Sequence, residues 1–129
     1  MKLYQIVAPL LALGCATVPT VNGQKQRVDY FFAPSCSPCQ ETEKIVDELE
    51  RRYGHQINLE RYCGISTIDP QLDERVCQLT FKQNSIESTN MLQVWGGERI
   101  PAIYVNQKVV EPKREVICRA LGLDENCLD

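Results

Sequence analysis

Two cysteines lie two residues apart, Cys36 and Cys39, at the point where an apolar run gives way to a helix-like run. The apolar run, residues 28–33, is rich in β-branched and aromatic side chains and predicts a strand. Residues 40–53 carry apolar side chains at steps of three and four and predict a helix. A C-x-x-C pair at a strand-to-helix junction is the arrangement that thiol–disulfide chemistry requires.

The position of each cysteine predicts its role in that chemistry. Cys36 stands at the helix N-terminus, where free N–H groups and the helix dipole favour the thiolate over the thiol. Its thiolate would attack a substrate disulfide, and Cys39, turned toward the core, would resolve the mixed disulfide. The intervening Ser37 and Pro38 tune the pKa of the attacking thiol. From the residues alone, an inert Cys36–Cys39 disulfide in a secreted module is the alternative.

The patterns around this pair predict a single α/β domain with the element order β-α-β-α-β-β-α. The predicted elements are strand 28–33, helix 40–53, strand 57–63, helix 69–83, strand 99–105, strand 108–110 and a helix opened by Pro112. Residues 84–90 are polar and predict a loop or a short helix. In the second helix, the expected core-facing stripe consists of Leu72, Val76, Leu79 and Thr80.

Composition excludes several classes of function. A length of 129 residues suits one domain, and a net charge of −3 without a basic patch argues against nucleic-acid binding. Seven cysteines favour an oxidising compartment or a metal site over a reducing cytosol. A metal site is disfavoured because there is one C-x-x-C and His55 lacks ligand spacing. We therefore expect no cofactor, no metal and a monomer.

The N-terminus predicts export, with residues 1–23 as a signal peptide before a domain of residues 24–129. The apolar run of residues 3–14 is too short for a permanent membrane anchor. Small residues at Val21 and Gly23 suit cleavage before Gln24.

A second processing site competes with the first. Residues 12–15 resemble a bacterial lipobox, after which Cys15 would carry lipid, although the order of its small and apolar residues departs from the usual one. Both sites predict a periplasmic or extracellular protein, and the second would attach it to a membrane through lipid alone.

The other cysteines predict disulfides. Without Cys15, six cysteines remain, and an even count suits up to three bonds. If Cys36 pairs with Cys39, three connectivities stay open for the remaining four: Cys63, Cys77, Cys118 and Cys127. We favour Cys63–Cys77 and Cys118–Cys127 because both close short loops. A second redox pair that relays electrons is the functional alternative for these cysteines.

Three features together resemble the thioredoxin superfamily over roughly residues 27–122. They are the run from Phe31 to Cys39, the dipeptide Ile100-Pro101, and the closing hairpin and helix. The resemblance implies a thioredoxin fold, a central mixed sheet flanked by helices, here with an extra helical segment before the cis-proline. It also implies that Pro101 is a cis-proline facing the cysteines, and that Ile100 offers backbone hydrogen bonds to a bound polypeptide.

Two departures from the family limit what the resemblance carries over. Thioredoxins have a buried acid six residues before the first cysteine, where this chain has Tyr30. The neighbouring Asp29 should point to the opposite face of the strand. The aromatic residue usual before the first cysteine is Ser35 here. Residues 62–100 are also longer than in a minimal thioredoxin, and we expect them to cap one side of the sheet.

The sequence therefore predicts an exported thiol–disulfide oxidoreductase that reduces, forms or isomerises disulfides through Cys36 and Cys39. Its expected partners are cysteine-containing protein substrates and a redox partner protein. By analogy with the proline in thioredoxin's C-G-P-C, Pro38 favours a reductase-like or isomerase-like poise. The alternatives are a secreted or lipid-anchored thioredoxin-fold binding module with a structural Cys36–Cys39 disulfide, and a cysteine-based metallochaperone.

Overall fold

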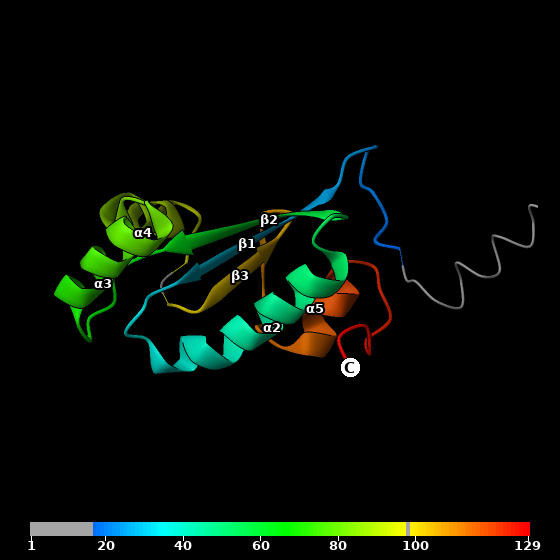
Figure 1. Cartoon of the computed structure of the whole chain (residues 1–129). Coiled ribbons are helices and arrows are strands. Elements are labelled where there is room, and N and C mark those ends of the chain that lie inside the picture. The colour runs from blue at the N-terminus through cyan, green and yellow to red at the C-terminus, as the bar shows by residue number, and fades with distance from the viewer. Residues whose placement is uncertain (1–16, 98) are drawn as a thin grey trace, which may run out of the picture.

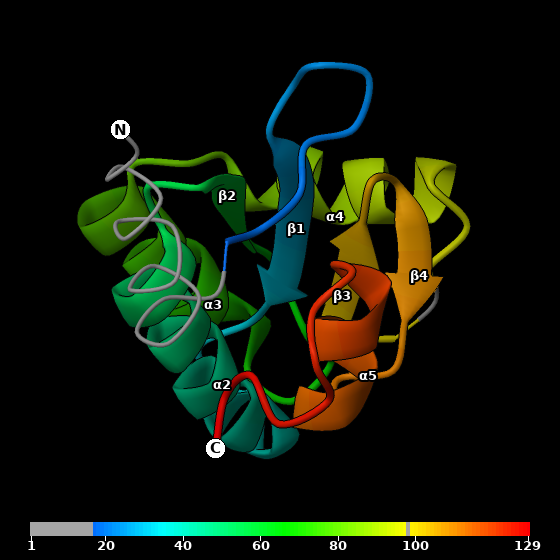
Figure 2. The same ribbon diagram turned by 90° about the vertical axis from the view of Figure 1, so that its right-hand side faces the viewer.

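Strand β1 (Gln26–Phe32) lies at the centre of a four-stranded mixed sheet with the order β2-β1-β3-β4 (Figure 2). Strand β2 (Ile57–Cys63) runs parallel to β1 on one side. On the other side β3 (Ala102–Val105) runs antiparallel to β1, and β4 (Lys108–Val110) pairs with β3 at the edge. The predicted architecture of a mixed sheet flanked by helices is confirmed.

The coordinates are a computed structural model that describes residues 17–97 and 99–129. The lipobox-like Cys15 and most of the predicted signal peptide lie outside the described residues. In the part of the chain that the structure describes, no helix has the length and apolarity needed to cross a membrane.

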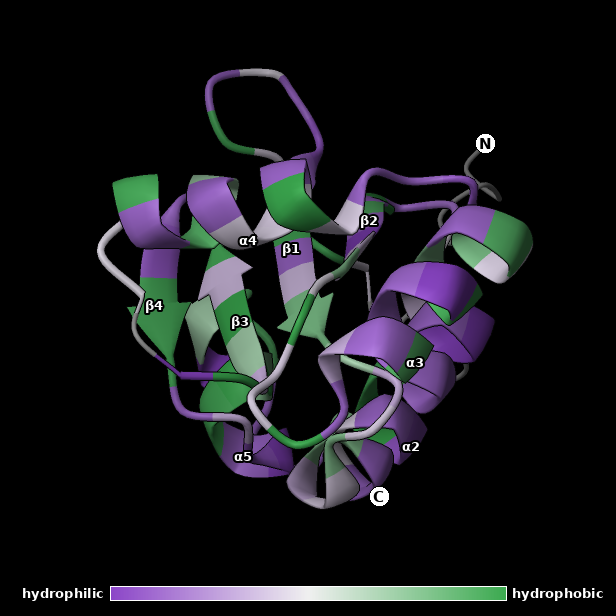
Figure 3. Cartoon of the chain, turned by 90° about the vertical axis from the view of Figure 1, so that its left-hand side faces the viewer, coloured by the Kyte–Doolittle hydropathy of each residue, from purple (hydrophilic) through white to green (hydrophobic). Residues whose placement is uncertain are grey.

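Helices cover both faces of the sheet (Figure 1). Helix α2 (Ser37–Tyr53) and helix α5 (Arg114–Ala120) pack on one face, and helix α4 (Ser85–Val94) packs on the other. Helix α3 (Pro70–Val76) continues into a π-helical turn, η1 (Cys77–Phe81), between β2 and α4. In Figure 3 the strand β3 is mostly hydrophobic, whereas the outer surfaces of α2 and α3 are mostly hydrophilic.

The central strand is buried on both faces, as its apolar run predicts. Val28 and Tyr30 are fully buried on the face covered by α2 and α5. Phe31 points the other way and stacks on Tyr62 with 4.6 Å between ring centroids. Trp95 meets Phe31 edge-on from the end of α4. Two aromatic layers therefore fix β1, and with it the loop that leads to Cys36.

The segment between β2 and β3 differs from the prediction. The stripe of Leu72, Val76, Leu79 and Thr80 does not face the core, because Leu72 is 37% exposed and Leu79 is 74% exposed. The side chains that turn inward are Asp73 and Cys77, both fully buried. The helix gives way to a π-helical turn after Val76, so a single 3.6-residue period does not hold through the segment.

Helix α4 begins where the sequence predicted a loop or a short helix over residues 84–90, and it extends to Val94. The Asn84 side chain caps it by accepting hydrogen bonds from the backbone N–H groups of Ile86 and Glu87, at 3.0 and 3.1 Å. This is the cap that an asparagine at a helix start provides. Helix α4 and the α3–η1 segment together make up the extra helical segment expected before the cis-proline. They do not cap one side of the sheet, because Cys77 and Phe81 pack with the core beneath α2 and α5, whereas α4 packs on the opposite face.

The residues just before β1 also contact the domain. Val18 is 4% exposed, and its backbone N–H donates to the Gln56 side chain at 2.7 Å. The Gln26 side chain donates to the carbonyl oxygen of Pro19 at 2.9 Å and to that of Leu121 at 2.8 Å. This segment lies at the opposite end of β1 from the loop that carries Cys36 (Figure 1).

Candidate active site

Cys36 and Cys39 form a disulfide at the start of α2, with 5.3 Å between their Cα atoms. Cys36 is the N-cap residue and has an extended backbone. Pro38 stands in the first turn, where the missing N–H has no helical partner to lose. The backbone N–H of Cys39 donates to the Cys36 sulfur at 3.2 Å. In the reduced protein this donor and the helix dipole would stabilise a Cys36 thiolate.

The two sulfurs differ in the space around them rather than in exposed fraction. Cys36 is 4% exposed and Cys39 is 3% exposed, so the greater exposure expected for Cys36 is not seen in these values. However, Cys36 lines two open grooves, of about 240 and 470 Å³, whereas Cys39 lines only the smaller one. A substrate in the larger groove therefore meets Cys36 alone.

The larger groove brings the predicted substrate-binding segment to Cys36. Its walls are Pro38, the loop of residues 65–68, the inner side of α4, and Arg99 with Ile100. The peptide bond between Ile100 and Pro101 is cis, as the resemblance implies. Ile100 thus shares a groove with the attacking cysteine.

Strand order, helix placement and the C-x-x-C pair at the start of α2 together decide the fold. The chain has a thioredoxin fold. Residues 99–101 form bends rather than the predicted start of β3, and Arg99 and Ile100 line the groove. Pro101 lines a different pocket, whose walls include neither Cys36 nor Cys39.

The smaller groove carries an acid that the sequence did not single out, Glu43. It is lined by Cys36, Cys39 and Glu43 among others. The Tyr30 hydroxyl lies 3.1 Å from the carbonyl oxygen of Cys39 and 3.3 Å from Glu43 Oε1, so it can donate to either oxygen. Burial raises the pKa of the Glu43 carboxyl, and nearby Arg61 opposes that rise. Tyr30 stands where thioredoxins have a buried acid, and its hydroxyl contacts the carboxyl of Glu43, one helical turn beyond Cys39.

The phenol of Tyr30 stays protonated. Burial raises its pKa, and the neighbouring negative charge of Glu43 raises it further. Arg61 on β2 contacts Glu43 at 3.6 Å, and it also pairs with Asp47 and Glu50 on α2 at 2.8 and 2.9 Å. These contacts fix the side of α2 that carries Glu43.

Asp29 lies on the opposite face of β1, as the alternation along the strand predicts. Its buried carboxylate accepts from Arg27 Nε at 3.0 and 2.8 Å. Arg27 also donates to the Tyr62 hydroxyl at 2.9 Å and lies over the Trp95 ring. Asp29 therefore belongs to the cluster beneath α4 and does not face Cys39.

A second acid missing from the sequence interpretation is Asp73. It is fully buried and accepts hydrogen bonds from Ser35, the residue before Cys36, and from Ser66. No local signal marks it, because an acid in the first turn of a helix is common at solvent-exposed positions.

The other four predicted cysteines form the Cys63–Cys77 and Cys118–Cys127 disulfides, the pairings that the short loops favoured. Three of these cysteines are fully buried and Cys127 is 8% exposed. None of the four is among the described residues that line either groove beside Cys36.

No protein-family model matches the sequence, and no curated protein matches it. Several solved structures are similar to this chain, among them three at low identity. One, described as the structure of a malarial protein, is 18% identical, with a TM-score of 0.44 over 68% of this chain and 78% of that one. Tryparedoxin II complexed with glutathionylspermidine is 13% identical, with a TM-score of 0.45 over 67% of each chain. Tryparedoxin from Trypanosoma brucei is 18% identical, with a TM-score of 0.45 over 77% and 83%.

Proposed function

We propose that the protein is a thiol–disulfide oxidoreductase that acts on cysteine-containing proteins through Cys36 and Cys39. The observation that carries the proposal is the placement of the Cys36 sulfur. It caps α2, accepts a backbone N–H, and lines an open groove together with Ile100, beside the cis bond to Pro101. A purely structural disulfide requires none of these features.

In the reducing direction, the Cys36 thiolate attacks one sulfur of a substrate disulfide. That bond breaks, a mixed disulfide forms, and the second substrate sulfur leaves as a thiolate that takes up a proton. The Cys39 thiolate then attacks the Cys36 sulfur, which releases the other substrate thiolate and forms the Cys36–Cys39 disulfide. The substrate gains two electrons, and a dithiol redox partner restores the reduced pair.

Glu43 is the group best placed to accept the proton that Cys39 must lose. It lines the same groove, and its raised pKa lies closer to neutral pH than that of an ordinary glutamate. A carboxyl with a raised pKa is an efficient general base near neutral pH. Tyr30 orients it through the shared hydroxyl contact.

The test is insulin reduction with dithiothreitol as electron donor, comparing wild type with Cys36→Ser. We expect wild type to accelerate insulin precipitation and the variant to fall to the uncatalysed rate. An inactive wild type whose Cys36–Cys39 disulfide resists mild reductant would contradict the proposal. By analogy with thioredoxin, Pro38 supports a reductase-like or isomerase-like poise, which the reduction potential of the pair would test.

We also propose that the protein is exported and that its processing site lies upstream of Val18. Cleavage before Gln24 would remove Val18, whose side chain is buried and whose N–H bonds to Gln56, and Pro19, which bonds to Gln26. These contacts support the lipobox-like site at Cys15, which leaves them intact. The intact mass and N-terminal sequence of the mature protein test this, and a mature chain starting at Gln24 would contradict it.

A further inference from the structure

A buried carboxylate lies against the residue that precedes the attacking cysteine. Asp73 Oδ1 accepts the backbone N–H of Ser35 at 2.8 Å, and Oδ2 accepts the Ser35 hydroxyl at 3.0 Å. Oδ2 also accepts the N–H and the hydroxyl of Ser66, each at 2.8 Å. Asp73 is fully buried, so these four bonds replace its hydration.

Helix α3 is fixed at both ends, so Asp73 is held in place. At its start, the Asp69 side chain accepts the N–H of Leu72 at 3.1 Å. Directly after it, Cys77 is bonded to Cys63 at the end of β2. The carboxylate therefore belongs to a rigid support beneath the active-site loop.

The charge of Asp73 opposes the helix dipole at Cys36. Asp73 Oδ1 is bonded to the N–H of Ser35, whose Cα lies about 3.8 Å from that of Cys36. A like charge at this range disfavours a thiolate. The N-terminus of α2 and the Cys39 N–H favour it.

The other titratable and charged groups around Cys36 come from three elements. Glu43 and Cys39 on α2 share the smaller groove with it, and Tyr30 on β1 contacts both. Arg99 lines the larger groove and is the one cation among the described residues that line either groove. Asp73 differs from these groups because it is fully buried and bonded directly to the loop that carries Cys36.

We propose that Asp73 is a positioning residue that anchors Ser35 and whose charge disfavours the Cys36 thiolate, which makes the Cys36–Cys39 couple more reducing. The inference rests on the proposed function of that pair. A destabilised thiolate destabilises the reduced form relative to the disulfide, so the reduction potential becomes more negative.

The test measures the pH dependence of Cys36 alkylation by iodoacetamide in the full chain, with Cys39→Ser so that one of the two active-site thiols reacts. Asp73→Asn keeps the shape of the side chain and removes its charge. We expect the midpoint of the alkylation profile to fall by about one pH unit, the size of effect that a charge at this distance exerts in a partly buried site. In the chain with Cys39 intact, the same variant should make the reduction potential less negative.

Two variants separate the charge from the hydrogen bonds. Glu74→Gln removes a like charge from the neighbouring position of α3 and should shift the midpoint by no more than a few tenths of a unit. Ser66→Ala removes the hydroxyl that donates to Asp73 but keeps the backbone N–H and leaves the charge, and should not lower the midpoint. If Asp73→Asn fails to fold, the double variant Asp73→Ala with Ser66→Ala is used instead. It removes the charge together with the Ser66 hydroxyl that donates to it, and we expect the same fall in the midpoint.

An unchanged or raised midpoint in the folded charge-removal variant would overturn the inference. An equal fall in Ser66→Ala would also overturn it, because loosening of the loop would then explain the effect. The alkylation assay measures the reactivity of Cys36 and needs no client protein. A failure of the inference can therefore be distinguished from a failure of the proposed function. If wild type failed to reduce insulin but Asp73→Asn still lowered the alkylation midpoint, only the proposed function would be contradicted.

Discussion

The Cys36–Cys39 and Cys118–Cys127 disulfides are chemically the same bond but lie in different surroundings. Exposed fraction does not separate them, since Cys36 is 4% and Cys127 is 8% exposed. What differs is the space beside the sulfurs. Cys36 lines two open grooves and accepts an N–H at its sulfur, whereas neither Cys118 nor Cys127 lines these grooves.

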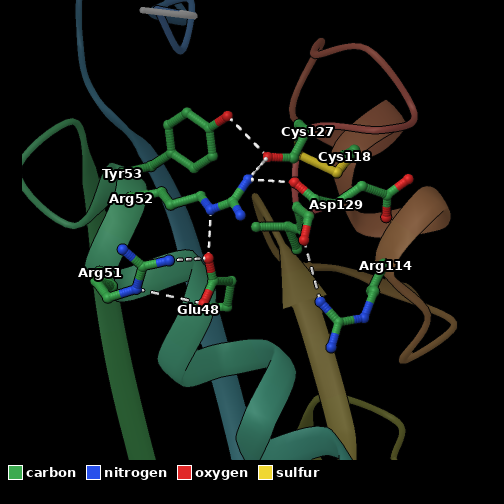
Figure 4. A network of polar contacts seen from close by, with 9 residues as sticks. Glu48, Arg51, Arg52, Tyr53, Arg114, Cys118, Cys127 and Asp129 are labelled. Atoms are coloured by element: carbon green, nitrogen blue, oxygen red, sulfur yellow. Dashed lines mark hydrogen bonds and ion pairs between the residues drawn. A yellow bond between two sulfur atoms is a disulfide. The ribbon is translucent and has the colours of Figure 1, made fainter.

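Backbone contacts enclose the C-terminal disulfide (Figure 4). The carbonyl oxygen of Cys127 accepts from the Tyr53 hydroxyl at 3.1 Å and from Arg52 Nη1 at 3.0 Å. The same Arg52 nitrogen reaches the backbone oxygen of Asp129 at 2.9 Å, and Arg114 donates to that of Leu128 at 3.2 Å. Arg52 is itself held by Glu48.

The comparison indicates that reactivity is set by what surrounds a disulfide. The Cys36 sulfur can react because it lies at a helix N-terminus beside an open groove. The Cys118–Cys127 disulfide is structural because its segment is buried and its backbone is held by hydrogen bonds.

The largest expected effect is covalent trapping. Cys39→Ser leaves Cys36 able to attack but removes the group that resolves the mixed disulfide. We expect this variant to accumulate mixed disulfides with a denatured, disulfide-containing client, visible on non-reducing gels. Cys127→Ser leaves Cys118 as the corresponding single thiol and should accumulate none, and trapping through Cys118 at a similar level would remove the distinction between the two pairs.

Removal of the C-terminal disulfide should affect stability and leave activity intact. The bond joins residues nine apart, and closing such a loop stabilises the fold by about 2–3 kcal/mol. Urea denaturation of Cys118→Ala with Cys127→Ala should show that loss, while insulin reduction stays within twofold of wild type. Lost activity in the folded variant would show that this pair takes part in the chemistry.

Glu43→Gln should slow the second step of exchange. Without a carboxylate to accept the Cys39 proton, we expect resolution of the mixed disulfide to slow by about tenfold or more near neutral pH. Glu41→Gln on the exposed side of α2 is the control. Stopped-flow measurement of mixed-disulfide decay checks this, and equal rates in the two variants would exclude Glu43 as the proton acceptor.

Tyr53→Phe tests the C-terminal contacts alone. The variant loses the hydroxyl that bonds to the carbonyl oxygen of Cys127 but keeps the buried ring. We expect a decrease of about 1 kcal/mol in the free energy of unfolding and no change in the reduction potential of Cys36–Cys39. A changed potential would mean that the two ends of the molecule are coupled.

The smallest effect concerns pH. Burial raises the pKa of Glu43 in the folded protein, so its contribution to stability is full below the unfolded pKa and is lost as pH rises through the folded value. Urea unfolding of Glu43→Gln should therefore vary less between pH 4 and 7 than that of wild type. A steeper dependence in the variant would contradict the burial of this carboxyl.

Local patterns predicted much of the fold. The apolar run into Ala33 predicted β1, and the C-x-x-C with Pro38 predicted the start of α2, because strand pattern and capping chemistry are encoded in neighbouring residues. The turn between the predicted strands 99–105 and 108–110 was found for the same reason, and it consists of Asn106 and Gln107. Both residues adopt positive φ angles, of 52° and 67°, in the hairpin.

The missed features depend on partners distant in the sequence. Asp73 is buried because Ser35, 38 positions earlier in the sequence, supplies hydrogen-bond donors that the helix sequence alone does not reveal. Glu43 is one of several acids along α2, and the helix sequence alone does not show that Tyr30 and Cys39 lie beside it. The exposed Leu79 was assigned to the core because a π-helical turn breaks the helical period.

The most direct test is a redox titration of the wild-type protein. Samples are equilibrated in buffers of graded potential, free thiols are alkylated, and mass spectrometry identifies which pair has opened. We predict that Cys36–Cys39 opens at a potential above about −300 mV while Cys63–Cys77 and Cys118–Cys127 stay closed. A Cys36–Cys39 bond that stays closed with the other two at that potential would contradict the account.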